Sequence, residues 1–211
     1  MNTDSPVPVK RAYHKTTNSH HRFYRHPNLL KPGPEQVTAL EPEQVWVADI
    51  TYLPLRNGTA YLSLVTDACS RKKLWATMLG KNLQTEKCGK SVQTGAEAEK
   101  NDESPRCIIL TGGLQYCSAL YQSVHERNGI TCSMTDGYDC YQNALAERIN
   151  GILKDEFLLS RPADLAQARE MVKESVAIYN HERPHLALKY KTPDDVHQAF
   201  YRQKSVNLYQ D

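Results

Sequence analysis

The feature that most limits how this chain can fold is an acidic residue inside an apolar strand. Residues Gln44–Leu55 (QVWVADITYLPL) are rich in β-branched and aromatic side chains, which is typical of a largely buried strand. Asp49 interrupts this run. A buried carboxylate is costly unless it is hydrogen-bonded, paired or bound to a cation. Asp49 therefore either caps a neighbouring backbone or serves as a metal ligand.

Length and composition allow one sizeable domain with extensions, or two small ones, in 211 residues. No apolar run reaches the roughly 20 residues needed to span a bilayer, and the basic N-terminus does not resemble a signal peptide, so we expect a cytoplasmic protein with no membrane partner. The six cysteines are scattered without a CxxC pair, which argues against disulfides. His20, His21 and His26 lack a second ligand pair at zinc spacing, so a zinc site is not expected.

The N-terminal residues form a basic arm. Six basic residues stand against Asp4 alone in residues 1–31, with aromatic residues between them. Such a segment suits a phosphate backbone, and a solvated leader is the alternative. Pro32, Gly33, Pro34 and Pro42 then predict an extended linker, so that the globular domain begins near Gln44. The candidate DNA-binding residues of the arm are Lys10, Arg11, Lys15, Arg22 and Arg25.

The pattern after residue 44 predicts an α/β fold with a mixed sheet. An Asn57-Gly58 turn joins the first two strands as a hairpin, and a third strand completes an antiparallel meander. Helices and short strands then alternate, which implies that parallel strands join the same sheet. The expected strands are residues 44–55, 60–67, 72–79, 107–110 and 130–134, and the expected helices are residues 81–103, 115–128, 142–159, one restarting near Pro162, and a short one from Pro193 to near Phe200.

The clearest helix, residues 142–159, has two distinct faces. Leu145, Ile149 and Leu153 belong to an apolar stripe, and Glu147 and Lys154 lie together on nearly the opposite side. The two charged residues belong either to a solvated face or to a site. If the first and fourth strands are neighbours, Asp49, the loop at Thr111 and Glu147 meet at one end of the sheet. Carboxylates converging there would hold Mg²⁺, and a pair of such ions would clamp the oxygens in phosphoryl transfer.

Several short stretches in fixed order resemble the retroviral-integrase-type catalytic core, the ribonuclease-H-like fold that integrases share with the DDE transposases of bacterial insertion sequences. The similarity is to the second open reading frame of a large insertion-sequence family, and it extends over most of residues 44–197. The resembling segments are Trp46–Leu53 (WVADITYL), Tyr61–Lys72 (YLSLVTDACSRK), Gln115–Ser118 (QYCS), Tyr141–Phe157 (YQNALAERINGILKDEF), Tyr179–Leu188 (YNHERPHLAL) and Thr192–His197 (TPDDVH), with Thr16–Phe23 (TTNSHHRF) as a lead-in.

The resemblance implies a transposase that joins a DNA 3′ hydroxyl to a target phosphodiester through an Asp, Asp, Glu triad and Mg²⁺ or Mn²⁺. Asp49 matches the first acid and Glu147 the third, both as metal ligands. It also implies DNA as the partner, a homo-oligomer on DNA, and a helix-turn-helix protein from the same element. Arg148 and Lys154 on the Glu147 helix join the arm as candidate phosphate contacts, with ordinary surface charge as the alternative.

The second acid of the triad is missing. Counting back from Gln115 places Thr111 at its position, and the 35 residues between Thr111 and Glu147 match the spacing of the family. A neutral hydroxyl is a poorer Mg²⁺ ligand than a carboxylate, so we expect impaired strand transfer. The acids that could substitute by composition are Asp102, Glu103, Asp136 and Asp139, and none has the offset of the family.

Two other functions are compatible with the same motifs. A truncated, catalytically dead relative would keep the fold and act at most as a DNA-binding protein. A ribonuclease-H-like nuclease without transposition is allowed by the fold and disfavoured by the segments after Glu147. The expected organisation is a basic arm and linker (1–43), an integrase-like core (44–160) and a C-terminal helical extension that packs on the core (161–211).

Overall fold

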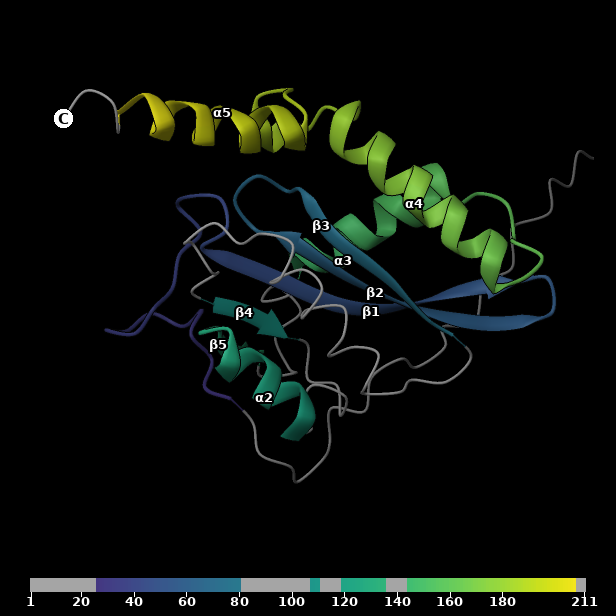
Figure 1. Ribbon diagram of the computed structural model, residues 1–211, viewed down its shortest axis with the longest axis horizontal. Coiled ribbons are helices and arrows are strands. Elements are labelled where there is room, and N and C mark those ends of the chain that lie inside the picture. The colour runs from purple at the N-terminus through teal and green to yellow at the C-terminus, as the bar shows by residue number, and fades with distance from the viewer. Residues whose placement is uncertain (1–25, 81–106, 111–118, 136–143, 208–211) are drawn as a thin grey trace, which may run out of the picture.

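The computed structural model describes residues 26–80, 107–110, 119–135 and 144–207 (Figure 1). The arm residues and Thr111 lie outside these ranges, as do the expected helix at 81–103 and the four candidate substitute acids. In the described part, no helix is both long enough and apolar enough to cross a membrane.

Within the described ranges, five strands form one mixed sheet in the order β3-β2-β1-β4-β5. Strands β1 (Val45–Leu55), β2 (Gly58–Asp67) and β3 (Lys73–Gly80) form the antiparallel meander that the sequence predicts. Strand β4 (Cys107–Leu110) pairs in parallel with β1, and β5 (Thr131–Met134) pairs in parallel with β4. The ribonuclease-H-like architecture is confirmed, and so is the adjacency of the first and fourth strands.

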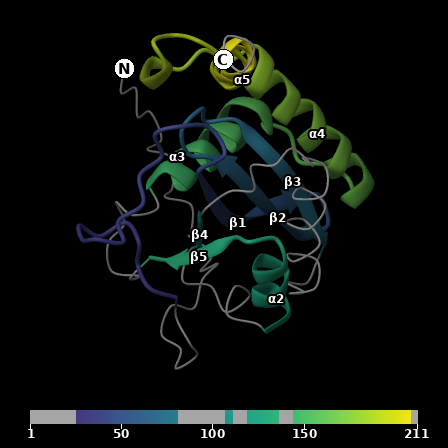
Figure 2. The same ribbon diagram turned by 60° about the vertical axis from the view of Figure 1, so that its left-hand side comes forward.

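Side chains of β1 alternate between two packed faces. Trp46, Ala48 and Ile50 share a core with Tyr121 and Val124 of α2 (Ala119–Arg127). The intervening residues face helices on the other side of the sheet. Figure 2 shows this layering, with α2 on one face and α3 and α4 over the other. Because both faces are covered, β1 is buried along most of its length.

Helix α3 (Ala144–Ile152) follows the second face of β1. Ala146 packs with Val45 and Val47, and Leu153 packs with Leu53 further along the strand. The expected single helix over 142–159 is wrong in one respect, because a π-helical turn, η3 (Leu153–Phe157), follows α3. The Leu158 amide donates to the Leu153 carbonyl at 2.9 Å, the five-residue spacing of a π turn.

Helix α4 (Leu165–His181) continues the cover of this face. Its first turn is closed by Asp164, which accepts from the Gln167 amide at 2.9 Å. Ala168 and Val172 then pack against β2 and η3 residues. Helix α4 therefore packs on the sheet and on η3.

Helix α5 (Pro193–Asn207) follows a short 3₁₀ turn, η4 (Leu186–Leu188). Thr192 and Asp195 cap it reciprocally at 3.1 Å, and Pro193 stands at its first position, as the sequence predicts. The expected end near Phe200 is wrong. No glycine or proline follows Phe200, and Tyr201 and Lys204 remain half-buried, so the helix continues.

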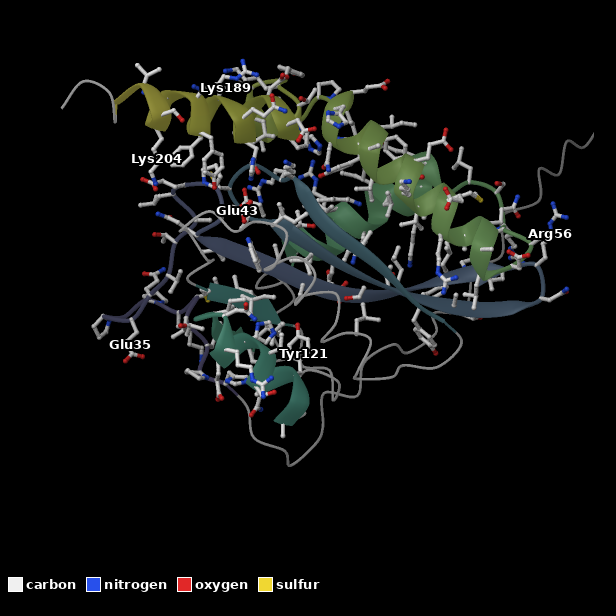
Figure 3. The ribbon with its side chains drawn as sticks, in the orientation of Figure 1. Glu35, Glu43, Arg56, Tyr121, Lys189 and Lys204 are labelled. Carbon is white, nitrogen blue, oxygen red and sulfur yellow. The ribbon has the colours of Figure 1, made fainter. Side chains whose placement is uncertain are left out.

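The segment before β1, expected to be an extended linker, lies against the body. Leu29 is buried with Val45 and Val47, and the Leu29 amide donates to Ser133 Oγ at 3.0 Å. Glu43, also buried, has its Oε1 2.7 Å from His197 Nε2 of α5, and its Oε2 accepts from Trp46 Nε1 at 2.8 Å. Figure 3 shows Glu43 beneath α5. The Glu43–His197 contact satisfies the buried carboxylate and links α5 to the start of the central strand.

The side chain of His125 in α2 is buried, and no polar group of the described residues pairs with it. It is 1% exposed, and neither ring nitrogen has a hydrogen-bond partner among the described residues. The ring contacts Tyr121 edge-on, with centroids 4.4 Å apart. Burial, followed by the charge of His26, lowers the pKa of His125 from 6.5 to about 4.

This depressed pKa makes folding sensitive to acid. Between pH 6.5 and pH 4 the unfolded chain binds a proton on His125 that the folded chain does not. The free energy of unfolding therefore has its full value above pH 6.5 and decreases as pH falls toward 4. The loss at about pH 5 is about 2 kcal/mol. In urea titrations, His125→Phe should lose about 2 kcal/mol less than the unmodified chain between about pH 7 and about pH 5. Equal losses in the two proteins would contradict this account.

Candidate active site

Asp49 lies in the middle of β1, on the face that α3 covers. It is only partly exposed, and its neighbours Ala48 and Ile50 are buried in the core on the opposite face. Across the sheet, Ala48 pairs with Leu110, the last described residue of β4. The carboxylate therefore lies one residue beyond the level of the C-terminal end of β4.

Helix α3 and the π-helical turn η3 carry three polar side chains on the side that meets Asp49. Glu147, Asn150 and Lys154 recur at intervals of three and four residues, so they share one face of the helix and its π-helical extension. Asn150 is buried, and its Nδ2 donates to Asp49 Oδ2 at 2.7 Å. Glu147 is exposed, and its charge acts on Asp49. The Asn150–Asp49 hydrogen bond thus places the turn of α3 that carries Glu147 beside the strand that carries Asp49.

The surroundings of Asp49 disfavour its charged form. Burial is the main cause that raises the pKa of Asp49 from 3.8 to about 6, and the negative charge of Glu147 adds to it. The Ile50 backbone, the Asn150 side chain and the charge of Lys154 act in the opposite direction. Burial therefore penalises the charged carboxylate by more than its own hydrogen bonds offset, and a bound cation would relieve this cost.

Lys154 is placed differently from a freely solvated lysine. Its side chain is half-buried, and Nζ lies 4.2 Å from the centroid of the Tyr52 ring. Burial lowers its pKa, against the attraction of Asp49 and Asp155. Arg148, by contrast, is exposed on α3. The solvated-face interpretation of the helix therefore fails for Lys154, which packs at the edge of the Asp49 site.

The described side chains of the site are of the chemical type that binds a divalent cation. Their number, two carboxylates, is too small to bind one alone. Carboxylate oxygens are the hard ligands that Mg²⁺ and Mn²⁺ prefer, and Asp49 and Glu147 supply them. In the ranges that the structure describes, no group of three His, Cys, Asp or Glu side chains is placed to hold a metal ion. The two acids would hold a cation only with further oxygen ligands, such as substrate or water.

Asn150 is the residue of this site that sequence reasoning missed. It follows Ile149 of the apolar stripe, and it lies three residues after Glu147, which is the spacing that places two side chains on the same side of a helix. This spacing from Glu147 is the feature of the sequence that could have identified Asn150. Only the tertiary structure shows that the amide meets Asp49.

Comparison with protein families gives two matches. Two models, each described as an integrase core domain, match residues 39–140 and 128–193. A 31 kDa protein of insertion element IS600 from Shigella sonnei is 32% identical over 199 residues, which span 92% of this chain and 69% of that protein. The transposase of insertion sequence element IS904 from Lactococcus lactis is 32% identical over 179 residues, which span 80% of this chain and 66% of that protein. The chain thus covers about two thirds of these relatives.

Solved structures share the fold at lower identity. The integrase catalytic core domain of HTLV-2, in complex with magnesium, superposes with a TM-score of 0.59 at 17% identity, covering 76% of this chain and 99% of that one. A chain of the simian T-cell lymphotropic virus intasome, solved with the PP2A regulatory subunit B56 gamma, gives a TM-score of 0.62 at 22% identity, covering 86% and 60%. Similarity at this level supports the architecture of the sheet and its helices.

Replacing Asp49 should stabilise the fold. The pKa of Asp49 is higher in the folded chain than in the unfolded chain, so the folded state favours the protonated carboxyl. Its contribution to the free energy of unfolding is fully present below about pH 4 and is lost as pH rises through about 6. In chelator-containing buffer at about pH 7.5, Asp49→Asn should increase the free energy of unfolding by up to about 3 kcal/mol, and the gain should shrink toward pH 4. The exposed acid Asp155 offers a matched control, and Asp155→Asn should change stability by less than about 0.5 kcal/mol. A destabilised Asp49→Asn would contradict the electrostatic account.

Proposed function

The chain belongs to the family of insertion-sequence transposases with an integrase core domain, and we propose that it acts in DNA transposition by metal-dependent strand transfer, with Asp49 and Glu147 as its catalytic acids. The observation that supports this proposal is the hydrogen bond at 2.7 Å between Asn150 of α3 and Asp49 of β1, which brings the helix face that carries Glu147 over the strand. An amide fixing a partly buried carboxylate is expected of a preorganised site rather than of a solvated surface.

In strand transfer, the oxygen of a DNA 3′ hydroxyl forms a bond to a target phosphorus, and the bond from that phosphorus to its own 3′ oxygen breaks. The attacking hydroxyl loses a proton and the leaving oxygen gains one. A divalent cation held by Asp49 and Glu147 would activate the hydroxyl and neutralise charge on the phosphate. Asn150 orients the Asp49 carboxylate for this task, and the burial of Ala48 and Ile50 fixes the strand beneath it.

Thr111 limits this activity in our proposal. With a hydroxyl in place of the second acid, the site has two carboxylates where the family has three, so it binds cations weakly and transfers strands slowly. If strand transfer is lost completely, the chain acts as a DNA-binding protein without catalysis.

DNA and other copies of the chain are the proposed partners. The relatives are proteins of insertion elements, and one structural neighbour comes from an intasome. The arm residues Lys10 to Arg25, together with Arg148 and Lys154, are the proposed phosphate contacts. A helix-turn-helix protein from the same element stays a prediction of the sequence.

A strand-transfer assay tests the site directly. With Mg²⁺ or Mn²⁺ and element-end DNA, Thr111→Asp should raise the rate at least about tenfold, because a third carboxylate strengthens cation binding. Adding Glu147→Gln to that variant should abolish the gain, whereas Glu182→Gln, which changes an exposed acid beyond α4, should not. Activity of the unmodified chain that survives Glu147→Gln would exclude the assignment.

The role of the arm is tested by the salt dependence of duplex binding. Each phosphate contact contributes about −0.9 to the slope of log K against log salt. Changing both Arg22 and Arg25 to Gln should therefore flatten that slope by up to about 2. Lys173→Gln, which removes an exposed charge on α4, should leave the slope unchanged. An identical slope in the arm variant would show that these residues do not contact phosphates.

A further inference from the structure

Lys73 is a cation buried in the interior. It is the first residue of β3, it is 1% exposed, and it ranks among the largest fully buried side chains. Burial, with the nearby charge of Arg183, lowers its pKa from 10.5 to about 7. An apolar residue of the same length would fill this space without the cost of desolvating an amine. The lysine therefore calls for an explanation other than packing.

Its contacts join three elements. The Nζ atom lies 4.6 Å from the centroid of the buried Tyr179 ring of α4 and 3.5 Å from the carbonyl oxygen of Ile149 in α3. The backbone amide and carbonyl of Lys73 are both bonded to the side-chain amide of Asn180, each at 2.9 Å. The main chain of residue 73 is thus fixed by α4, and its side chain extends from there to α3.

The carbonyl that Lys73 reaches belongs to the helix that carries the proposed site. Ile149 lies two residues after Glu147 and directly before Asn150, which holds Asp49. Beyond it, the π-helical turn η3 is held by Arg183, whose Nε and Nη2 donate to Glu156 at 2.6 and 2.7 Å. Asn180, near the end of α4, fixes Lys73, which contacts Ile149 of α3. Arg183, in the loop after α4, binds Glu156 of η3. The α3–η3 segment is therefore held at two points.

We infer that Lys73 is a positioning residue, whose Nζ–Ile149 contact fixes the height of Glu147 and Asn150 over Asp49. It does not touch the reacting atoms. Both the ammonium and the neutral amine donate hydrogen bonds, so the contact persists on either side of neutrality. This inference deepens the proposed function, since it matters for catalysis only if Glu147 and Asp49 form the site.

A positioning role predicts opposite effects on stability and on the site. Lys73→Met keeps the length of the side chain and removes the buried amine, so the melting temperature should be unchanged or higher. Amide hydrogen exchange in residues 147–153 should nevertheless accelerate about fivefold or more, because α3 loses a fixed contact. In the Thr111→Asp background, kcat for strand transfer should fall about tenfold or more, with little change in KM for DNA.

Two variants make the test specific. Lys72→Met changes the adjacent lysine, whose Nζ lies 3.3 Å from Asp194 Oδ1, and it should alter neither exchange in α3 nor kcat. Lys73→Gln keeps a donor on a shorter side chain, and it should restore part of the protection that Lys73→Met removes.

The exchange measurement does not depend on activity, so it separates the two proposals. Absence of strand transfer in the Thr111→Asp chain would reject the proposed function and leave the exchange result standing. Unchanged exchange in Lys73→Met would overturn the positioning role, and so would equal acceleration in Lys72→Met. An unfolded Lys73→Met would also overturn it, because the amine would then be needed for the fold itself.

Discussion

The main constraint on the second face of the sheet is a carboxylate in the middle of the central strand, which the fold has to accommodate. Asp49 stands between residues that form the core, and the cost of desolvating it is visible in its raised pKa of about 6. The fold compensates locally. The Asn150 amide donates to the carboxylate, and α3 is the element that delivers this amide. The packing of α3 against β1 thus satisfies a charge as well as burying apolar surface.

That constraint explains the arrangement of the second face of the sheet. Ala146 and Leu153 pack on either side of Asn150 along β1, so the polar contact lies between two apolar ones. Apolar contacts set how closely the helix approaches, and the polar contact sets its register along the strand. A slip by one residue would replace Asn150 with Ile149 or Gly151 and leave Asp49 without its donor.

The C-terminal segment stabilises this arrangement from outside. Asn180 and Tyr179 of α4 hold Lys73, and Arg183 holds Glu156 of the π-helical turn. At the same end of the sheet, the Glu43–His197 pair joins α5 to the residue two positions before β1, and the Glu43 amide donates to Asp67 Oδ1 at 3.1 Å. The segment Tyr179–His185 (YNHERPH) supplies several of these contacts. Its side chains therefore hold in place the strand and helix that carry Asp49 and Glu147.

The sequence by itself determined the local elements and indicated the candidate acids. Alternating apolar residues, the Asn57-Gly58 turn and the Thr192–Asp195 cap depend on neighbours within a few positions, so the meander and the start of α5 were predictable. Asp49 and Glu147 were identifiable through family motifs. Only the tertiary structure decided which residues meet across the chain. It placed Asn150 on Asp49, packed Lys154 on Tyr52, buried Lys73 under α4 and brought Leu29 and Glu43 into the body. Such contacts join positions far apart in sequence, and whether a polar side chain is solvated or buried depends on the elements that cover it.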